Sequence, residues 1–300
     1  MRLILVVLLA VSLPCAAHAT DWHPFRWYMA SIGGGPVERA AMLLPVKVNG
    51  IDCQVQLDTG VRDALIWSRQ ATASESTPGA TRTALIELAG IRKSMPAQPA
   101  NLAPLTPEIC AAGPIATVGN AFFEHGTLTL DLGRARFAFA AAPGLAGEPA
   151  AQAMRYTRWE EGGGAPLVEV ERPGGKTGYA MLDTGSARFG LVATSAQAWS
   201  DLSGGLPLAE GPKVKAMSVH SWGRQLPCYE TALAGGFDAG GARGLQATVS
   251  YCVDQEFHFA VKVIGVLGLR PFGDRVIALD YLSGLWRLSE AAPQPSSTGL

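Results

Sequence analysis

Two segments of the chain repeat one pattern. Residues 43–61 read Leu-Leu-Pro-Val-Lys-Val-Asn-Gly-Ile-Asp-Cys-Gln-Val-Gln-Leu-Asp-Thr-Gly-Val, and residues 165–186 read Ala-Pro-Leu-Val-Glu-Val-Glu-Arg-Pro-Gly-Gly-Lys-Thr-Gly-Tyr-Ala-Met-Leu-Asp-Thr-Gly-Ser. Each segment is an alternating strand, a turn, a second strand and then Leu-Asp-Thr-Gly. The turns Asn49-Gly50 and Gly174-Gly175 are typical of β-hairpins. The repeat therefore indicates an internal duplication of one β unit.

A second shared pattern follows each Asp-Thr-Gly. It consists of an apolar strand ending in Gly, an aromatic residue, a strand ending in Asp, a small turn and a last strand. The matching segments are 115–119, 122–123, 128–131 and 136–139 in the first half, and 263–268, 271–272, 276–280 and 285–288 in the second. A single Asp-Thr-Gly also occurs as a plain turn between strands. Two copies with the same flanks instead indicate a paired functional unit.

The composition is that of a turn-rich globular chain. Its 300 residues include 35 Gly and 20 Pro, which favours many turns and short strands over long helices. The formal net charge is −1, without a basic run or an acidic tail. We therefore expect no nucleic-acid partner.

The first nineteen residues are typical of an export signal. Arg2 precedes an apolar run at 3–13, and Ala17-His18-Ala19 is an Ala-x-Ala cleavage site. Cys15 raises a lipid anchor as an alternative, although Ser12-Leu13-Pro14 departs from the lipidation pattern. No later segment is long and apolar enough to cross a membrane. We expect a periplasmic or secreted protein with no membrane span.

Four cysteines remain after the signal: Cys53, Cys110, Cys228 and Cys252. An even count in an exported chain favours disulfides, although four buried free thiols are the alternative. Of the three possible pairings we prefer Cys53–Cys110 and Cys228–Cys252, because each pair then lies within one half of the chain. There is no Cys-x-x-Cys and no histidine at ligand spacing, so neither a metal nor a cofactor is expected.

On these motifs the chain resembles the two-lobed aspartic proteases of the pepsin type, with features of the smaller retropepsin-like lobes. The resemblance covers about residues 42–140 and 165–290. It implies an all-β, bilobal pepsin-like acid protease fold, with two related β-barrel-like lobes and a cleft between them. The expected organisation is a signal peptide at 1–19, an N-terminal lobe at 20–148, a linker at 149–164 and a C-terminal lobe at 165–300.

The resemblance also implies roles for the residues of the two motifs. Asp58 and Asp183 become a catalytic pair that shares one proton and activates a water molecule. The supporting residues are Thr59, Gly60, Thr184, Gly185 and Ser186: the threonines link the two loops, the glycines allow tight turns and Ser186 reaches Asp183. The implied activity is that of an aspartic endopeptidase, acting as a monomer on a polypeptide in extended conformation.

Two features depart from the family pattern. Val61 follows the first Asp-Thr-Gly, where its side chain offers Asp58 no hydrogen bond. Residues 61–118 contain no Tyr, although pepsin-like enzymes carry a Tyr on a flap there. The Gly-rich stretch 234–244 is a candidate lid, with a plain surface loop as its alternative. These departures keep open a second function, a non-proteolytic peptide- or protein-binding protein on the same fold.

Overall fold

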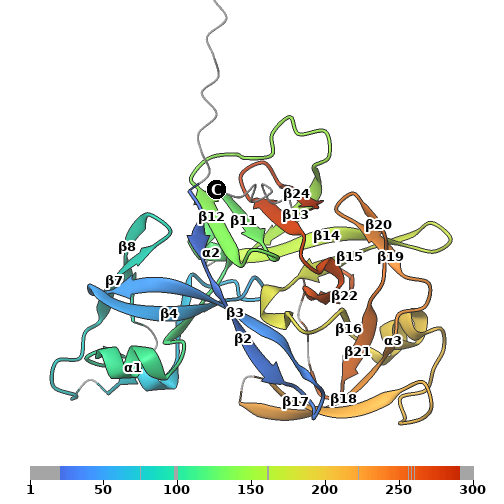
Figure 1. Ribbon diagram of the computed structural model, residues 1–300, viewed down its shortest axis with the longest axis horizontal. Helices are drawn as coiled ribbons and strands as arrows, with labels where there is room; N and C mark the ends of the chain where they lie inside the picture. The colour runs from blue at the N-terminus through green and yellow to red at the C-terminus, as the bar shows by residue number, and fades with distance from the viewer. Residues whose placement is uncertain are drawn as a thin grey trace, which may run out of the picture.

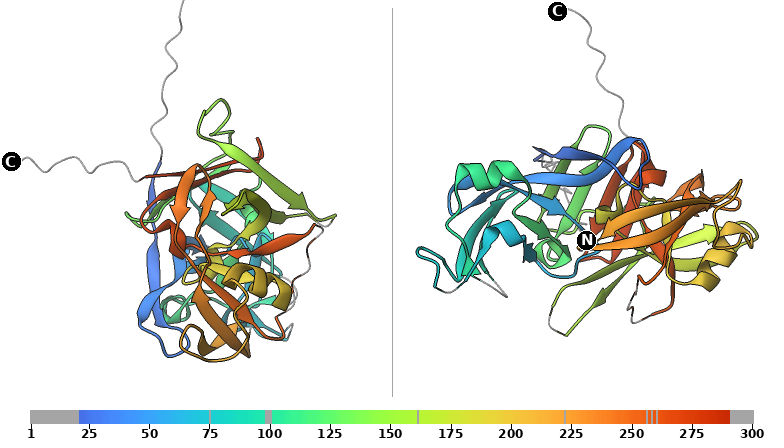
Figure 2. Two further views of the ribbon diagram at one scale, coloured as in Figure 1. Left: turned by 90° about the vertical axis from the view of Figure 1, so that its right-hand side faces the viewer. Right: turned by 90° about the horizontal axis from the view of Figure 1, so that it is seen from below.

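The computed structural model describes residues 21–74, 76–97, 101–160, 162–221, 223–255, 257, 259 and 261–290. The expected signal at 1–19 lies outside the described residues. Strands dominate the described part, and its α-helices are short: α1 (Pro107–Ala112), α2 (Asn120–Phe123) and α3 (Ala196–Ser203). The first half of the chain and the second half lie side by side (Figures 1 and 2). The predicted all-β, two-lobed fold class is thereby confirmed.

The first half forms a seven-stranded sheet in the order β5-β10-β4-β3-β7-β8, with β2 paired to β3. Its strands are β2 (Arg26–Ser31), β3 (Val37–Val48), β4 (Ile51–Leu57), β5 (Leu65–Trp67), β7 (Thr83–Leu88), β8 (Ile91–Pro96) and β10 (Ala116–Val118). Asn49 and Gly50 turn β3 into β4 with positive φ angles of 50° and 85°, as a tight hairpin requires. Strand β10 inserts between β4 and β5, parallel to β4 and antiparallel to β5.

The second half repeats this arrangement. Its strands are β14 (Gly164–Arg172), β15 (Lys176–Leu182), β16 (Leu191–Ala193), β17 (Lys215–Ser221), β18 (Arg224–Ala232), β19 (Phe237–Ala239), β20 (Ala242–Leu245), β21 (Thr248–Cys252) and β22 (Val263–Leu267). Strand β22 inserts between β15 and β16, parallel to the first and antiparallel to the second. The two inserted strands are the apolar-Gly segments of the sequence repeat, so the repeat in sequence is a repeat in topology.

The closing strands of the two halves pair with one another and continue into the sheet of the second half, while the seven-stranded sheet of the first half stays separate. They are β1 (His23–Pro24), β11 (Thr127–Asp131), β12 (Arg136–Ala140), β13 (Gln152–Arg158), β23 (Val276–Asp280) and β24 (Leu285–Ser289). Strand β11 pairs with β23 in antiparallel register, with Thr129 opposite Ala278 at the centre. The segment expected to be a linker, 149–164, contains β13, which pairs with β24 and with β14. The lobe boundaries themselves stay a prediction.

Both preferred disulfides are present. Cys53 on β4 is bonded to Cys110 on α1, and Cys228 on β18 is bonded to Cys252 on β21. The second bond joins residues that lie directly opposite each other in adjacent strands. Within the described residues, no helix has the length and apolar character needed to span a bilayer.

Candidate active site

The two Asp-Thr-Gly loops begin at equivalent points of the two halves. Asp58 follows β4, and its N–H donates to the carbonyl of Val118 at 3.0 Å. Asp183 follows β15, and its N–H donates to the carbonyl of Leu267 at 2.9 Å. The last residue of each inserted strand therefore holds the start of the aspartate loop, which explains why the apolar-Gly segment recurs after each Asp-Thr-Gly.

The glycine after each inserted strand is required by close backbone approach. A Cβ at Gly119 would collide with the carbonyl oxygens of Val61 and Asp63. A Cβ at Gly268 would collide with those of Ser186 and Phe189. In both halves the loop after the aspartate wraps over this glycine, so any side chain there would push the loop away from the site.

The two threonines lock the loops together through four hydrogen bonds. The Thr59 hydroxyl donates to the Leu182 carbonyl at 2.7 Å and accepts from the Thr184 N–H at 3.0 Å. The Thr184 hydroxyl donates to the Leu57 carbonyl at 3.2 Å and accepts from the Thr59 N–H at 2.9 Å. Both threonines are fully buried. The loops are thus fixed relative to each other by a symmetric cross-link that excludes water.

The glycines of the motif let the two carboxyl groups approach. The N–H of Gly60 donates to Asp58 Oδ1 at 2.9 Å, and the N–H of Gly185 donates to Asp183 Oδ1 at 2.8 Å. A Cβ on Gly60 would lie 2.8 Å from the carboxyl carbon of Asp183. A Cβ on Gly185 would collide with the carboxyl group of Asp58. Each glycine therefore faces the opposite aspartate, and only the absence of a side chain lets the pair meet.

Burial and charge proximity favour the protonated form of Asp58. Asp58 is only 8% exposed. Burial, the neighbouring charge of Asp183 and a hydrogen bond between the two carboxyl groups raise the pKa of Asp58 well above its ordinary value. The N–H groups of Gly60 and Val61 lower the pKa and offset only part of this rise. The pair is therefore expected to hold one proton and one negative charge.

The residues after the two glycines make the pair asymmetric. Ser186 Oγ donates to Asp183 Oδ2 at 2.7 Å. Val61 occupies the matching place in the first loop, buried and with no side-chain donor. Asp183 therefore accepts hydrogen bonds from a hydroxyl and an N–H, while Asp58 lacks the hydroxyl. Asp183 thus has one more hydrogen-bond donor from a side chain than Asp58 has.

A cavity of about 520 Å³ opens over the pair. Its floor contains Asp58, Asp183, Gly60, Val61 and Met181. A wall of the cavity is formed by the β17–β18 hairpin and the segment after β21. These segments contribute Arg224, Leu226, Asp254, Gln255 and Phe257. We call the described residues of this hairpin, 215–221 and 223–232, the lid. The lid thus belongs to the second half of the chain, whereas family likeness placed a flap in the first.

The interpretation of 234–244 as a lid was wrong. Strand β19 in this stretch pairs with β14. Gly240 packs so closely on Trp286 and Leu288 that a Cβ there would lie 2.7 Å from the indole ring. None of these residues lines the cavity over the aspartates. Gly235, Gly236 and Gly240 are in places where a Cβ would collide with neighbouring atoms, whereas nothing lies within 4 Å of a Cβ at Gly244.

Sequence reasoning missed the lid residues Arg224 and Leu226. The available signal was the alternating run 215–221 followed by Gly223, which has a φ of 78° at the hairpin turn. That signal predicts a hairpin but carries no information on where the hairpin lies. Its position depends on contacts with distant segments.

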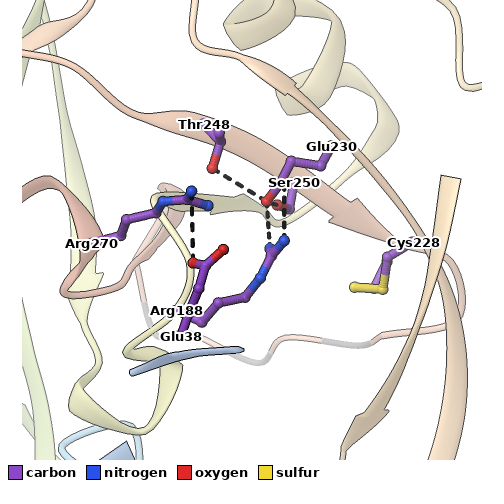
Figure 3. A network of polar contacts seen from close by, with 8 residues as sticks. Glu38, Arg188, Cys228, Glu230, Thr248, Ser250 and Arg270 are labelled. Atoms are coloured by element: carbon purple, nitrogen blue, oxygen red, sulfur yellow. Dashed lines mark hydrogen bonds and ion pairs between the residues drawn. A yellow bond between two sulfur atoms is a disulfide. The ribbon is translucent and has the colours of Figure 1, made fainter. Parts of the chain in front are cut away.

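One of those contacts is a buried ion pair between the lid and the second aspartate loop (Figure 3). The guanidinium of Arg188 donates to both carboxylate oxygens of Glu230, at 2.6 and 3.1 Å. Thr248 and Ser250 on β21 also donate to this carboxylate, at 3.3 and 3.2 Å. Because Arg188 lies two residues after Ser186, the pair sets the lid strand relative to the loop that carries Asp183.

The described residues contain no group of three or more His, Cys, Asp or Glu side chains arranged to hold a metal ion.

Comparison with known proteins adds little to this geometry. No family model matches the chain, and no curated protein matches it. A solved structure that matches is basic 7S globulin from soybean, which is 12% identical with a TM-score of 0.41. The match covers 91% of this chain and 97% of the globulin chain. The strand pairing and contacts of this chain itself therefore define its fold and its site.

Proposed function

We propose that the chain is an aspartic endopeptidase whose catalytic residues are Asp58 and Asp183. One observation carries the proposal. Two carboxyl groups from repeated loops face each other, joined by a hydrogen bond, at the floor of a cavity of about 520 Å³. Peptide hydrolysis without a covalent intermediate needs one group that takes a proton from water and another that gives one to the carbonyl oxygen, and such a pair can do both.

The asymmetry of the site assigns the two roles. Asp58, with its raised pKa, is the acid that protonates the carbonyl oxygen of the scissile bond. Asp183, supported by the Ser186 hydroxyl and the Gly185 N–H, is the carboxylate that takes a proton from water. Acid–base assistance of this kind typically accelerates a reaction by about 10²–10⁴-fold.

Hydrolysis then follows in two balanced steps. In the first, the water oxygen bonds to the carbonyl carbon, the water proton passes to Asp183 and the Asp58 proton passes to the carbonyl oxygen. The product is a neutral gem-diol. In the second, Asp183 returns its proton to the amide nitrogen, one gem-diol hydroxyl returns its proton to Asp58, and the C–N bond breaks. The pair ends in its starting state, with an amine and a carboxylic acid released.

The proposed substrate is a polypeptide in extended conformation, bound across the cavity in the manner of an added strand. Both halves of the chain contribute to the cavity: the first aspartate loop lies in its floor and the lid of the second half forms a wall, which suits a segment that passes between them. We extend the proposal to a monomer in the periplasm or outside the cell, since disulfides persist in oxidising compartments.

A peptide- or protein-binding protein without catalysis is the second candidate, and Val61 favours it by leaving Asp58 without a hydroxyl partner. Incubation with an unfolded protein mixture from acidic to neutral pH separates the two candidates. We expect cleavage by the wild type and none by Asp58→Asn or Asp183→Asn. Absence of cleavage by the wild type at every pH would contradict the enzyme proposal. Cleavage by all three proteins would point to a contaminating protease.

A further inference from the structure

A second cavity, of about 260 Å³, lies beside the first. The two cavities share Leu226 and Gln255 as a common wall. The first borders Gly60 and Val61, whereas the second borders Gly185 and Ser186. The cavities thus lie against opposite loops of the aspartate pair. A strand that crosses the pair would place side chains from either side of its scissile bond into different cavities.

The outer wall of the second cavity is the first hairpin of the first lobe's sheet, formed by β2 and β3. Residues 26–41, which we call the arm, run along β2, turn at Gly33-Gly34 and return along β3. The arm contributes Tyr28, 55% exposed, and Ile32 to the cavity. No Tyr is present in residues 61–118, where a flap was expected, and this arm places one beside the second aspartate loop.

The arm reaches the lid and packs on it. Ile32 packs against a small apolar cluster formed by lid residues and the adjacent disulfide, separate from the main core. The cluster consists of Met217, Val219, Leu226, Cys228 and Cys252. At the arm's turn, Gly33 lies so close to the lid that a Cβ there would be 2.6 Å from the Cβ of Met217. The cavity therefore exists because arm and lid meet over the loop that carries Ser186.

The lining of this cavity favours an uncharged, apolar occupant. Tyr28, Ile32, Phe189, Val219 and Leu226 supply its large apolar side chains, and Gln56, His220 and Gln255 also line it. Arg188, which also lines the cavity, already donates hydrogen bonds to both carboxylate oxygens of Glu230. Among the described residues the cavity lining contains no Asp or Glu to pair with a cationic side chain. A charged substrate side chain would also lose hydration there, which is costly without compensation.

We propose that the cavity between arm and lid is a specificity pocket that takes one large apolar side chain of the substrate, such as Leu, Met or Phe. The inference rests on the proposed peptidase function and adds to it the residues that select the cleavage position. Tyr28 and Ile32 are then specificity-determining residues, and the close contact of Gly33 with Met217 holds the arm against the lid.

Cleavage of a random peptide library, read by mass spectrometry, tests the pocket. We expect the wild type to favour Leu, Met or Phe over Asp or Lys at one position near the cut by about tenfold or more. Tyr28→Ala should flatten this preference at that position alone. A peptidase that cuts with no such preference, or whose preference survives Tyr28→Ala unchanged, would overturn the pocket while leaving the peptidase proposal intact.

The arm's turn offers a matched pair of variants. Gly33 and Gly34 have φ angles of +60° and +71°, so Ala imposes similar backbone strain at both. Only at Gly33 would the added methyl meet the lid, since nothing lies within 4 Å of a Cβ at Gly34. Gly33→Ala should weaken the apolar preference severalfold, and Gly34→Ala should retain it. Equal loss in both variants would contradict the role of the arm–lid contact.

If the wild type cleaves no peptide, the peptidase proposal is rejected. A binding measurement then still tests the pocket. The Asp58→Asn protein is immobilised, and the same library is passed over it. Recovery of peptides enriched in Leu, Met or Phe, and loss of that enrichment when Tyr28→Ala is added, would support an apolar pocket. Uniform recovery, or no recovery, would overturn it.

Discussion

Replacing Val61 by Thr should shift the alkaline limb of the activity profile to lower pH. Val61 and Ser186 occupy matching positions, because their N–H groups donate to the carbonyls of Asp58 and Asp183 at 3.1 and 3.3 Å. Ser186 Oγ reaches its aspartate at 2.7 Å. Thr retains the branched shape of Val and adds a hydroxyl at the place from which Ser186 donates. The variant should therefore give Asp58 the hydrogen bond that it lacks.

The expected size follows from one hydrogen bond to a charged group. Such a bond contributes about 1.5–3 kcal/mol, and about 1.4 kcal/mol corresponds to one pKa unit. A donor that favours the ionised form lowers the pKa of Asp58 by about one to two units. Because Asp58 must be protonated to act as the acid, its activity should be lost at a pH about one to two units lower than in the wild type.

The assay is kcat/KM for one peptide as a function of pH, for wild type, Val61→Thr and Val61→Ala. The Ala variant removes both methyl groups of Val61 without adding a hydroxyl, so it separates the hydrogen bond from the change in packing. An alkaline limb that stays in place in Val61→Thr would refute the assignment of Asp58 as the proton donor. An equal shift in Val61→Ala would refute the hydrogen bond as its cause.

Three further perturbations test other contacts. Thr59→Val leaves the buried Thr184 N–H without its acceptor and should lower the free energy of unfolding by about 2–4 kcal/mol, whereas Thr59→Ser should not; denaturant titration measures both. Because the pKa of Asp58 is raised in the folded protein, it should contribute stability that is fully present below the carboxyl pKa of the unfolded chain. This stability should be lost as the pH rises through the raised pKa of the folded protein. Thermal unfolding of Asp58→Asn should not show this loss of stability with pH. Arg188→Met leaves Glu230 buried without its cation and should cost about 3–5 kcal/mol, part of which a second Glu230→Met change should recover.

The sequence predicted the elements whose signals are local and duplicated. Hairpin turns at Asn49-Gly50 and Gly174-Gly175 have distinctive residues, and the structure has turns at both places. The apolar-Gly segments recur because each one hydrogen-bonds to the start of an aspartate loop and packs closely against that loop. The preferred cysteine pairs, each within one half, are the pairs that the structure contains. All-β architecture followed from these signals and was confirmed.

The lid and the arm could not be located in the same way. Gly-rich sequence at 234–244 suggested mobility, but Gly240 serves contact with Trp286 instead. The lid hairpin has ordinary strand residues, and contacts with distant segments hold it, among them the Arg188–Glu230 pair, whose members are 42 positions apart. The segment expected as a linker contains β13, because its pairing with β14 and β24 has no local signal in the sequence.

Kinetics of the single and double aspartate variants test the central claim most directly. If Asp58 and Asp183 act as one unit, each Asp→Asn change should lower kcat/KM for a peptide by about a thousandfold or more, and the double variant should be no worse than either single one. Circular dichroism must show that all three variants are folded. A single variant within about tenfold of the wild type, or a double variant whose loss is the product of the two single losses, would contradict a shared-proton pair at this site.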